Sequence, residues 1–461
     1  MQPSPASSAS TTRAPLPPGR FLLGHLIDYK RDMMGFLAAR QAEQGDIFRI
    51  RLGRREIHML CHPDMAEQVL IKERGSFGKV AELGGPPRGL PLVLGKGLVT
   101  NYGEAWQRQR QLIQPIFHKG QIARMADTMT AAGERLLTRW RDQFQPGAVV
   151  DIAQEMMRVT VDIVSETMFG EDVADKVDVI GESFPRLLRY AFASLTDPFT
   201  PPLHWPTPGN RAFLRARDQL DQLIYELIEH RLKGGEPRGD LLDMLLAARH
   251  EDSGEAMSFE QLRDEVATVF GAGHETTANA LSWTWYLLAG HDAVRARLRE
   301  ELRTVLGGRT PTFADLPSLP YTRAVFEESM RLFPPAPVIP RAVMRNTHIG
   351  GYALQKGELT ITNAFLIHQH PGFWREPAKF DPERFLPGAA GPAHRCAYIP
   401  FGAGPRVCIG NHFALMEGQL LLAQIAQRYD LKLVPGQKIE REVAVTMRPK
   451  YGMRMTLNPI Q

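Results

Sequence analysis

The sequence has only three cysteines, Cys61, Cys396 and Cys408, among 461 residues. So small and odd a number excludes a disulfide-stapled fold and fits a reducing compartment. No stretch of eighteen consecutive apolar residues occurs, so we expect no membrane span. Basic tracts are absent, and 55 basic against 51 acidic residues leave a net charge of only +4, which argues against a nucleic-acid-binding protein. These absences favour a cytoplasmic globular protein.

The first nineteen residues differ in composition from the rest of the chain. Residues 1–19 are rich in serine, threonine, proline and alanine, and they lack the apolar stretch of a signal peptide. A segment of this kind cannot bury enough apolar surface to fold. We therefore expect a disordered N-terminal tail over residues 1–19.

Apolar residues recur at helical spacing through much of the chain. The longest such pattern runs from Ser258 to Leu288, and Ser258 with Gln261 resembles a capping box. Alternating residues within 47–60 predict a two-stranded hairpin. Further helical periodicity covers residues 63–71, 122–170 and 211–232, whereas 81–98 resembles an apolar loop and 184–208 combines aromatic residues with many prolines.

One cysteine lies in a glycine-rich loop, Phe401–Gly410, with Arg406 two residues before Cys408. Glycine permits positive φ and the close approach of another group. A nearby cation and oriented N–H groups stabilise a thiolate. After Gly410 the apolar pattern becomes helical, so Cys408 stands just before a helix N-terminus, where the dipole also favours negative charge. Cys408 is therefore a candidate thiolate ligand.

Two other interpretations of this cysteine are open at the level of the residues. Most lone cysteines are small buried hydrophobic residues. A zinc site could instead be formed by His394, Cys396, Cys408 and His412, whose ligand types suit zinc although their spacing matches no usual finger.

The loop resembles the haem-binding signature F-x-x-G-x-R-x-C-x-G of the cytochrome P-450 family, with all five fixed positions present. The resemblance implies that Cys408 is the axial ligand of haem b (iron protoporphyrin IX) and that Arg406 pairs with a haem propionate. Phe401 and Gly410 would also belong to the haem site. The family's fold is mainly α with small β-sheets, and the haem lies between a long central helix and the cysteine loop with its helix.

The longest predicted helix contains the run Gly271-Ala272-Gly273-His274-Glu275-Thr276-Thr277. Two glycines inside a helix cost about 1 kcal/mol each relative to alanine, and threonines compete for backbone carbonyls. Either a kinked core helix or a helix with a group pressed against it would explain this composition. The family pattern A-G-x-[DE]-T matches Ala272, Gly273, Glu275 and Thr276. The resemblance implies that this turn crosses the haem and relays protons through Glu275 and Thr276.

Three further residues match haem-propionate positions of the family, and a fourth, Lys79, is a candidate for the same role. Trp106 and Arg110 are four residues apart and hence on one helix face, where an isolated pair is ordinarily solvated or forms a cation–π contact. They match the family's W-x-x-x-R. Arg341, which follows Pro340, matches a further propionate-binding arginine, and Lys79 is the fourth candidate.

Glu328 and Arg331 match the family's E-x-x-R. Spacing alone carries little weight, because the same spacing occurs at Glu155/Arg158, Glu260/Arg263 and Glu300/Arg303 and ordinarily gives a surface ion pair. Only Glu328 is followed by Leu332-Phe333-Pro334-Pro335, a strand-like run, the stretch Phe380–Phe385 and the cysteine loop. The resemblance implies a buried triad of Glu328, Arg331 and Arg384, and we expect removal of Glu155 or Glu260 to be nearly silent.

The five motifs stand in the family's order, which implies a single catalytic domain over residues 20–461 with a lid at 184–208. The activity implied is that of a monooxygenase that activates dioxygen and hydroxylates or epoxidises a lipophilic small molecule such as a fatty acid, terpenoid or steroid. Electrons would come from a separate ferredoxin or flavodoxin type donor with its NAD(P)H reductase. A peroxide-driven peroxygenase and a non-catalytic haem-thiolate gas-sensing or binding protein are the alternatives, and the Glu275-Thr276 pair favours oxygen activation.

Overall fold

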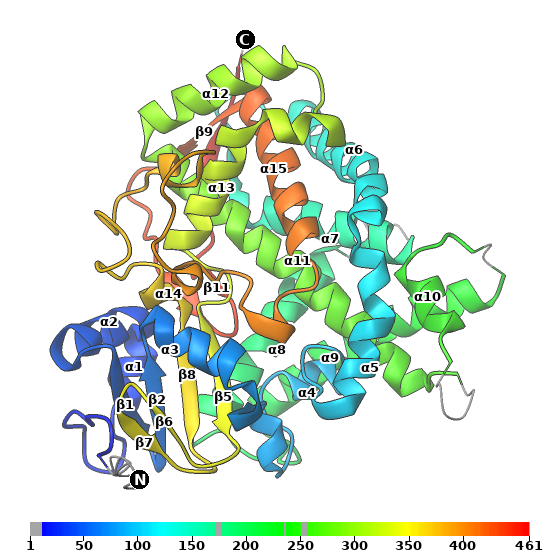
Figure 1. Cartoon of the computed structure of the whole chain (residues 1–461). Helices are drawn as coiled ribbons and strands as arrows, with labels where there is room; N and C mark the ends of the chain where they lie inside the picture. Colours follow the sequence, from blue (N-terminus) through cyan, green and yellow to red (C-terminus); the bar gives the residue numbers. More distant parts are fainter. Residues whose placement is uncertain (1–11, 171–176, 235–236, 250–255, 461) are drawn as a thin grey trace, which may run out of the picture.

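Helix α11 (Phe259–Ala289) runs through the middle of the computed structural model, which describes residues 12–170, 177–234, 237–249 and 256–460 (Figure 1). The predicted long helix is confirmed, and its start is the predicted one, because Ser258 accepts a hydrogen bond from the Gln261 N–H at 3.1 Å. Most side chains of α11 are buried, since helices from several parts of the chain pack around it.

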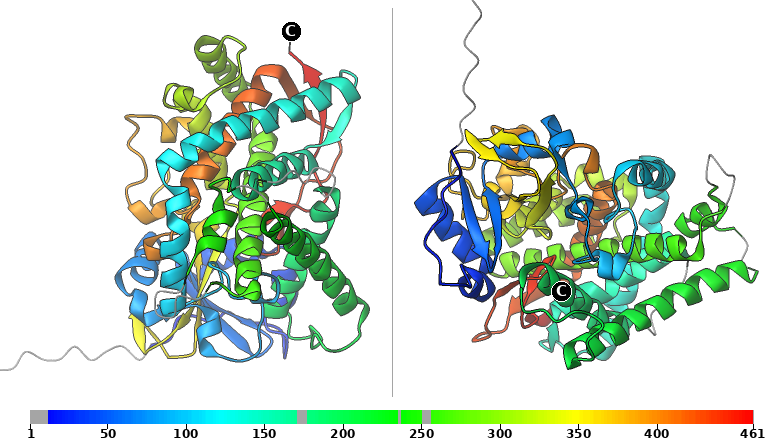
Figure 2. Two further views of the ribbon diagram at one scale, coloured as in Figure 1. Left: turned by 90° about the vertical axis from the view of Figure 1, so that its right-hand side faces the viewer. Right: turned by 90° about the horizontal axis from the view of Figure 1, so that it is seen from below.

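Most of the other helices lie around α11, whereas α1 and α2 lie beside a sheet (Figures 1 and 2). The α-helices are α1 (Leu26–Arg31), α2 (Met33–Gln44), α3 (Pro63–Glu67), α4 (Pro91–Leu94), α5 (Gly103–Ile113), α6 (Lys119–Gln143), α7 (Ile152–Phe169), α8 (Val177–Thr196), α9 (Pro208–Leu232), α10 (Leu241–Ala247), α12 (Asp292–Leu306), α13 (Pro320–Leu332), α14 (Ala364–Ile367) and α15 (Asn411–Arg428). Short helical turns are η1 (Gln68–Lys72), η2 (Arg74–Ser76), η3 (Val80–Leu83), η4 (Gln114–Phe117), η5 (Phe313–Ser318), η6 (Pro382–Phe385), η7 (Arg395–Ala397) and η8 (Gly404–Arg406).

The strands form small sheets, the largest with the order β1-β2-β8-β5-β3. Its members are β1 (Ile47–Leu52), β2 (Arg55–Leu60), β3 (Phe77–Gly78), β5 (Val338–Val343) and β8 (Leu359–Asn363). A second sheet has the order β4-β12-β9, and two hairpins are formed by β6 with β7 and by β10 with β11. These strands are β4 (Val149–Asp151), β6 (Thr347–Ile349), β7 (Tyr352–Leu354), β9 (Tyr429–Leu433), β10 (Arg441–Val443), β11 (Met447–Pro449) and β12 (Arg454–Pro459).

The hairpin predicted at residues 47–60 is confirmed, because β1 and β2 pair antiparallel with Ile50 opposite Ile57. The tail prediction fails in its second half. Residues 1–11 lie outside the described residues, but the Thr12 carbonyl accepts from the Ala353 N–H at 3.0 Å and the Pro15 carbonyl from the Arg49 N–H at 2.7 Å. Ala14 is buried in the core beside this sheet. Extended backbone at a sheet edge therefore orders this stretch despite its polar composition.

Two further predicted segments differ in the structure. The periodicity at 122–170 belongs to two helices, α6 and α7, which are separated by β4 where the chain pairs with β12. Within 184–208, the segment that combines aromatic residues with many prolines, helix α8 continues through Pro185 to Thr196, and only residues 197–207 form a loop.

The main core joins α11 to α6, α7, α13 and α15, and Phe401 and Ile409 of the segment before α15 pack against this core. A smaller core lies between the largest sheet and helices α1 and α2. No described helix is both long and apolar enough to cross a lipid bilayer.

Candidate active site

The loop before α15 is folded tightly around Cys408. The Cys408 N–H donates to the Phe401 carbonyl at 2.9 Å and the Val407 N–H to the Gly404 carbonyl at 3.0 Å. Gly404 has φ +72°, and a Cβ there would lie 2.1 Å from the Leu70 carbonyl oxygen, so only glycine fits. The loop then passes directly into α15, which begins after Gly410.

The Cys408 side chain keeps accessible surface while the protein surrounds it. Cys61 and Cys396, by contrast, are buried free thiols. Loss of hydration raises the pKa of the Cys408 thiol, whereas the Gly410 N–H and the Arg110 guanidinium act in the opposite direction. Because Cys408 is exposed, the small buried hydrophobe considered from the sequence does not describe this residue.

One face of α11 is open at the turn singled out from the sequence. Ala272 is exposed and Thr276 half-buried, although Gly271 and Glu275 beside them are buried. The Thr276 hydroxyl donates to the Ala272 carbonyl at 2.9 Å, so the two residues share this face. The glycines serve packing on the other faces, because a Cβ on Gly271 would lie 2.4 Å from the Phe184 ring.

Cations gather where the resemblance expects haem propionates. Arg341 and Arg406 line a cavity of about 370 Å³ together with Trp106 and Glu82. The Arg406 guanidinium lies 4.1 Å from the Trp106 ring centroid, and that of Arg110 lies 5.8 Å from it.

The cations of this cluster outnumber the nearby carboxylate of Glu82, whose charge acts to raise the pKa of Lys79, Arg341 and Arg406. Among the described residues, Lys79, Arg110, Arg341 and Arg406 make no ion pair; Arg110 donates to the Val407 carbonyl at 3.0 Å and Arg406 to the Asn101 carbonyl at 3.1 Å. Burial, with the charges of Arg341 and Arg406, lowers the pKa of Lys79 to about 7. Burial and Arg406 lower the pKa of Arg341 to about 10. Such a cluster is suited to a ligand that carries negative charge.

The structure brings Glu328, Arg331 and Arg384 together. Arg331 on α13 donates to both Glu328 oxygens at 2.6 and 2.8 Å, and neither side chain is exposed. Arg384 Nε approaches Glu328 Oε1 at 3.4 Å. Arg331 also donates to the carbonyls of His368, Pro377 and Lys379 at 2.9, 2.7 and 3.0 Å, and thereby fastens the segment that leads to the cysteine loop.

The other Glu/Arg pairs of equal spacing behave differently from one another. Glu300 and Arg303 form an exposed ion pair, and Glu260 is exposed. Glu155, expected to be dispensable, is instead 8% exposed and accepts from Trp140 Nε1 at 2.5 Å and from Arg139. The prediction that its removal would be silent is wrong, because i,i+3 spacing does not show which partner α6 supplies.

Glu275 does not lie on the open face with Thr276. Its Oε1 accepts from the Thr446 hydroxyl at 2.8 Å, and the carboxyl is 1% exposed. Burial raises the pKa of Glu275 to about 7, although the Thr446 hydroxyl and the Arg448 cation lower it. Sequence reasoning missed Thr446, since nothing in the local pattern of a residue 171 positions away signals this contact.

The zinc alternative finds no support in the described residues. His394 Nδ1 accepts from the Cys396 N–H at 3.0 Å, while burial raises the pKa of Cys396 to about 11. Within the described ranges, the metal-like grouping is Asp46 with His62 and His370.

That grouping has the wrong tautomers for a metal. Nδ1 of His62 and Nδ1 of His370 accept from the N–H groups of Asp64 and Gly372 at 3.2 and 3.0 Å. The proton of each neutral ring therefore sits on Nε2, which in His370 lies 3.1 Å from the Asp46 carboxylate as its donor. A metal ion bound at Nε2 would need the lone pair that this proton occupies.

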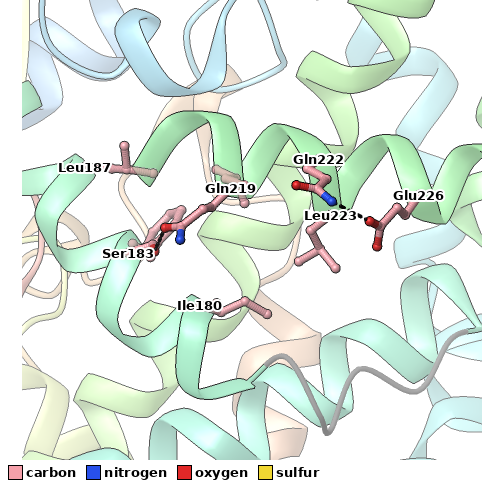
Figure 3. A pocket seen from close by; sticks show the side chains of 9 residues that line it. Ile180, Ser183, Leu187, Gln219, Gln222, Leu223 and Glu226 are labelled. Carbon is pink, nitrogen blue, oxygen red and sulfur yellow. Dashed lines mark hydrogen bonds between the residues drawn. The ribbon is translucent and has the colours of Figure 1, made fainter. Parts of the chain in front are cut away.

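A second cavity, of about 250 Å³, lies between α8 and α9 (Figure 3). Its apolar walls include Leu187 and Leu223, and Ser183 donates to Gln219 at 2.8 Å across it. Phe184 also lines this cavity and packs its ring against buried His274, with centroids 4.8 Å apart. Helix α8 thus contacts α11 one residue from Glu275.

Comparison with known proteins agrees with this geometry. The family model for cytochrome P450 matches residues 14–455. The chain belongs to the cytochrome P450 family. It is 36% identical over 449 residues to cyclooctatin synthase of Streptomyces melanosporofaciens, which covers 96% of this chain and 94% of the relative. It is 35% identical to cyclooctat-9-en-7-ol 5-monooxygenase of the same organism, with 94% of each chain covered.

Solved structures give the same family and fold. Cyanobacterial CYP120A1 with bound retinoic acid superposes with a TM-score of 0.85 at 27% identity, covering 98% of this chain and all of the other. This cytochrome P450 is therefore a monooxygenase with a haem-thiolate cofactor, and it uses dioxygen. The residues present fit that cofactor, because an exposed cysteine and a group of four cations beside the carboxylate of Glu82 offer partners for an iron and for two carboxylates.

Proposed function

We propose that this cytochrome P450 inserts one oxygen atom into a cyclic terpenoid, by hydroxylation or epoxidation. The observation that carries the haem assignment is that Cys408 is exposed whereas the other two cysteines are buried, and that a group of cations without an ion pair in the described part of the chain includes Arg110, whose charge acts on Cys408. Support for the substrate class comes from relatives, since cyclooctat-9-en-7-ol 5-monooxygenase and pentalenene oxygenase of Streptomyces avermitilis, the latter 30% identical over 437 residues, are named for such compounds.

In this proposal Cys408 binds the iron of haem b, and the four cations neutralise its propionates. The Trp106 ring and backbone carbonyls fix Arg406 and Arg110, which would bind the cofactor from one side. Lys79 and Arg341 would neutralise the remaining negative charge of the propionates. A haem with a thiolate ligand supplies the activation of dioxygen, because the thiolate favours O–O cleavage.

Residues of α11 would make room for small ligands, hold water and deliver protons. The open turn of α11 at Ala272 would give room to small ligands, and Thr276 would place its hydroxyl on that face, where it can hold a water molecule. Glu275, with a pKa of about 7, can both hold and release a proton near neutral pH, as a proton-delivering acid must.

Electrons would come from a ferredoxin or flavodoxin type donor with its NAD(P)H reductase. The chain's three cysteines are free thiols, which supports a reaction in the reducing cytoplasm where such donors and NAD(P)H are present.

The experiment is turnover of the haem-loaded protein with a surrogate ferredoxin and reductase. Cyclic diterpene and sesquiterpene hydrocarbons and alcohols are compared with a fatty acid and a steroid under isotopically labelled dioxygen. The proposal expects one labelled oxygen atom in a terpenoid product. Product formed only from a fatty acid or steroid would overturn the substrate class, and faster turnover with hydrogen peroxide than with the redox partners would overturn the electron source.

A further inference from the structure

The C-terminal hairpin formed by β10 and β11 is fastened directly to α11. Trp283 Nε1 donates to the Met447 carbonyl at 3.1 Å, and the Met447 N–H donates to the Pro335 carbonyl at 2.9 Å. The tip is closed by the Ala444 N–H, which donates to the Thr446 carbonyl at 3.2 Å. Thr446 therefore has a fixed position beside the central helix.

The Glu275 carboxyl has two polar neighbours that lower its pKa: the Asn279 side chain on α11 and, in the hairpin, the hydroxyl of Thr446. Thr446 donates to Oε1 at 2.8 Å, while Oε2 is buried without a hydrogen bond of ordinary geometry in the described part of the chain. Thr446 and Glu275 are 7% and 1% exposed, so water does not compete freely for this bond. A donor to the charged form favours that form.

This bond holds the carboxyl away from the open face of α11. Successive helical residues point about 100° apart, because the helix has 3.6 residues per turn. Thr276 bonds the Ala272 carbonyl on the open face, whereas Glu275 is turned toward the hairpin. Delivery of a proton to the open face therefore requires the carboxyl to leave Thr446.

The charges that act on Glu275 also come from the hairpin. Arg448 and Glu442 stand opposite each other in the β10–β11 register, and Arg448 donates to Glu442 Oε2 through Nε and Nη2 at 2.8 and 2.6 Å. Glu442 Oε1 in turn accepts from Arg189 of α8 at 3.1 Å. Arg448 lowers the pKa of Glu275 and Glu442 raises it, after the larger effect of burial.

We propose that Thr446 is a positioning residue for Glu275: its hydroxyl holds the carboxyl on the hairpin side of α11 between proton transfers. The acid is thereby linked to the hairpin and, through Glu442 and Arg189, to α8. The proposal rests on the proposed proton-delivering role of Glu275. No covalent bond is broken in this arrangement, since Thr446 only donates a hydrogen bond to Glu275 Oε1.

The first test reads the carboxyl itself. Infrared difference titration of the haem-loaded protein follows the protonated-carboxyl band, which Glu275→Gln assigns by removing it. Thr446→Val deletes the hydroxyl and keeps the shape, and we expect the titration midpoint to rise by roughly one to two pH units, the worth of a hydrogen bond to a charged group. Thr446→Ser should return it to the wild-type value, and Thr456→Val, on β12, is the matched control.

The second test is coupling, measured as product and hydrogen peroxide per NAD(P)H. Thr446→Val should lower product per NAD(P)H several-fold and move the pH profile upward, with Thr446→Ser close to wild type. An unchanged infrared midpoint in Thr446→Val would overturn the proposal, and so would a shifted midpoint with unchanged coupling. Full coupling in Glu275→Gln would instead overturn the acid's role in the proposed function, while the infrared titration would still decide whether Thr446 holds the carboxyl.

Discussion

Replacement of Arg331 by alanine tests the buried triad most severely. The guanidinium makes two bonds to Glu328 and three to backbone carbonyls, and neither charged side chain is exposed. Removing one partner of a buried ion pair leaves the other charge unpaired and costs roughly 3–5 kcal/mol. The three carbonyls left without a donor add to that cost. Arg331→Ala should therefore remove much of a typical stability of about 5–15 kcal/mol.

The assay is urea unfolding followed by circular dichroism, together with haem content after purification. The matched control is Arg303→Ala, which breaks the exposed Glu300 pair of identical spacing and should cost less than about 0.5 kcal/mol. Arg331→Lys keeps the positive charge but loses the bidentate geometry of the guanidinium, so we expect a loss of stability between those of the two alanine variants. An Arg331→Ala protein that unfolds at the same urea concentration as Arg303→Ala, with full haem, would refute the reasoning.

Three further changes have defined outcomes. Thr276→Ala should leave electron flow intact but raise hydrogen peroxide and lower product per NAD(P)H, because general acid–base contributions are typically about 10²–10⁴-fold; unchanged coupling would contradict the relay. Burial raises the pKa of Glu265 to about 8 from 4.5, so the folded state binds its proton more tightly and this contribution to stability falls as pH rises from about 4.5 to 8, at up to about 1.4 kcal/mol per pH unit. Glu265→Gln should flatten urea-unfolding free energies over that range, and an identical pH slope would count against it. Gly418→Ala places a Cβ 2.3 Å from the Phe326 ring, and should lower the free energy of unfolding by about 1–3 kcal/mol, whereas an unchanged value would show that the ring can move.

The sequence predicted elements that depend on local pattern. Ser258 caps α11 as expected, the hairpin at 47–60 forms, and α15 starts directly after the cysteine loop. Such features follow from backbone preferences and periodicity over a few residues. The buried pairing of Glu328 with Arg331 was reached only through the order of several motifs, since spacing does not distinguish it from Glu300 with Arg303.

What could not be predicted depends on long-range packing. The ordering of residues 12–18 requires a sheet edge near Arg49, and the burial of Glu155 requires Arg139 and Trp140 from a neighbouring helix. The direction of the Glu275 carboxyl likewise depends on a hairpin far along the chain. In each case the two contacting residues are separated in sequence, and the local pattern around either one does not show how the intervening chain folds.

The central claim, that Cys408 supplies the thiolate ligand of the haem, is tested most directly by the spectrum of the reduced protein with carbon monoxide. The wild-type protein should show the long-wavelength Soret band of a thiolate-ligated complex. Cys408→Ser should lose that band, because a hydroxyl is a poor replacement for a thiolate, whereas Cys61→Ser and Cys396→Ser should keep it. A Cys408→Ser protein that retains the long-wavelength band, or a wild-type protein without it, would contradict the account.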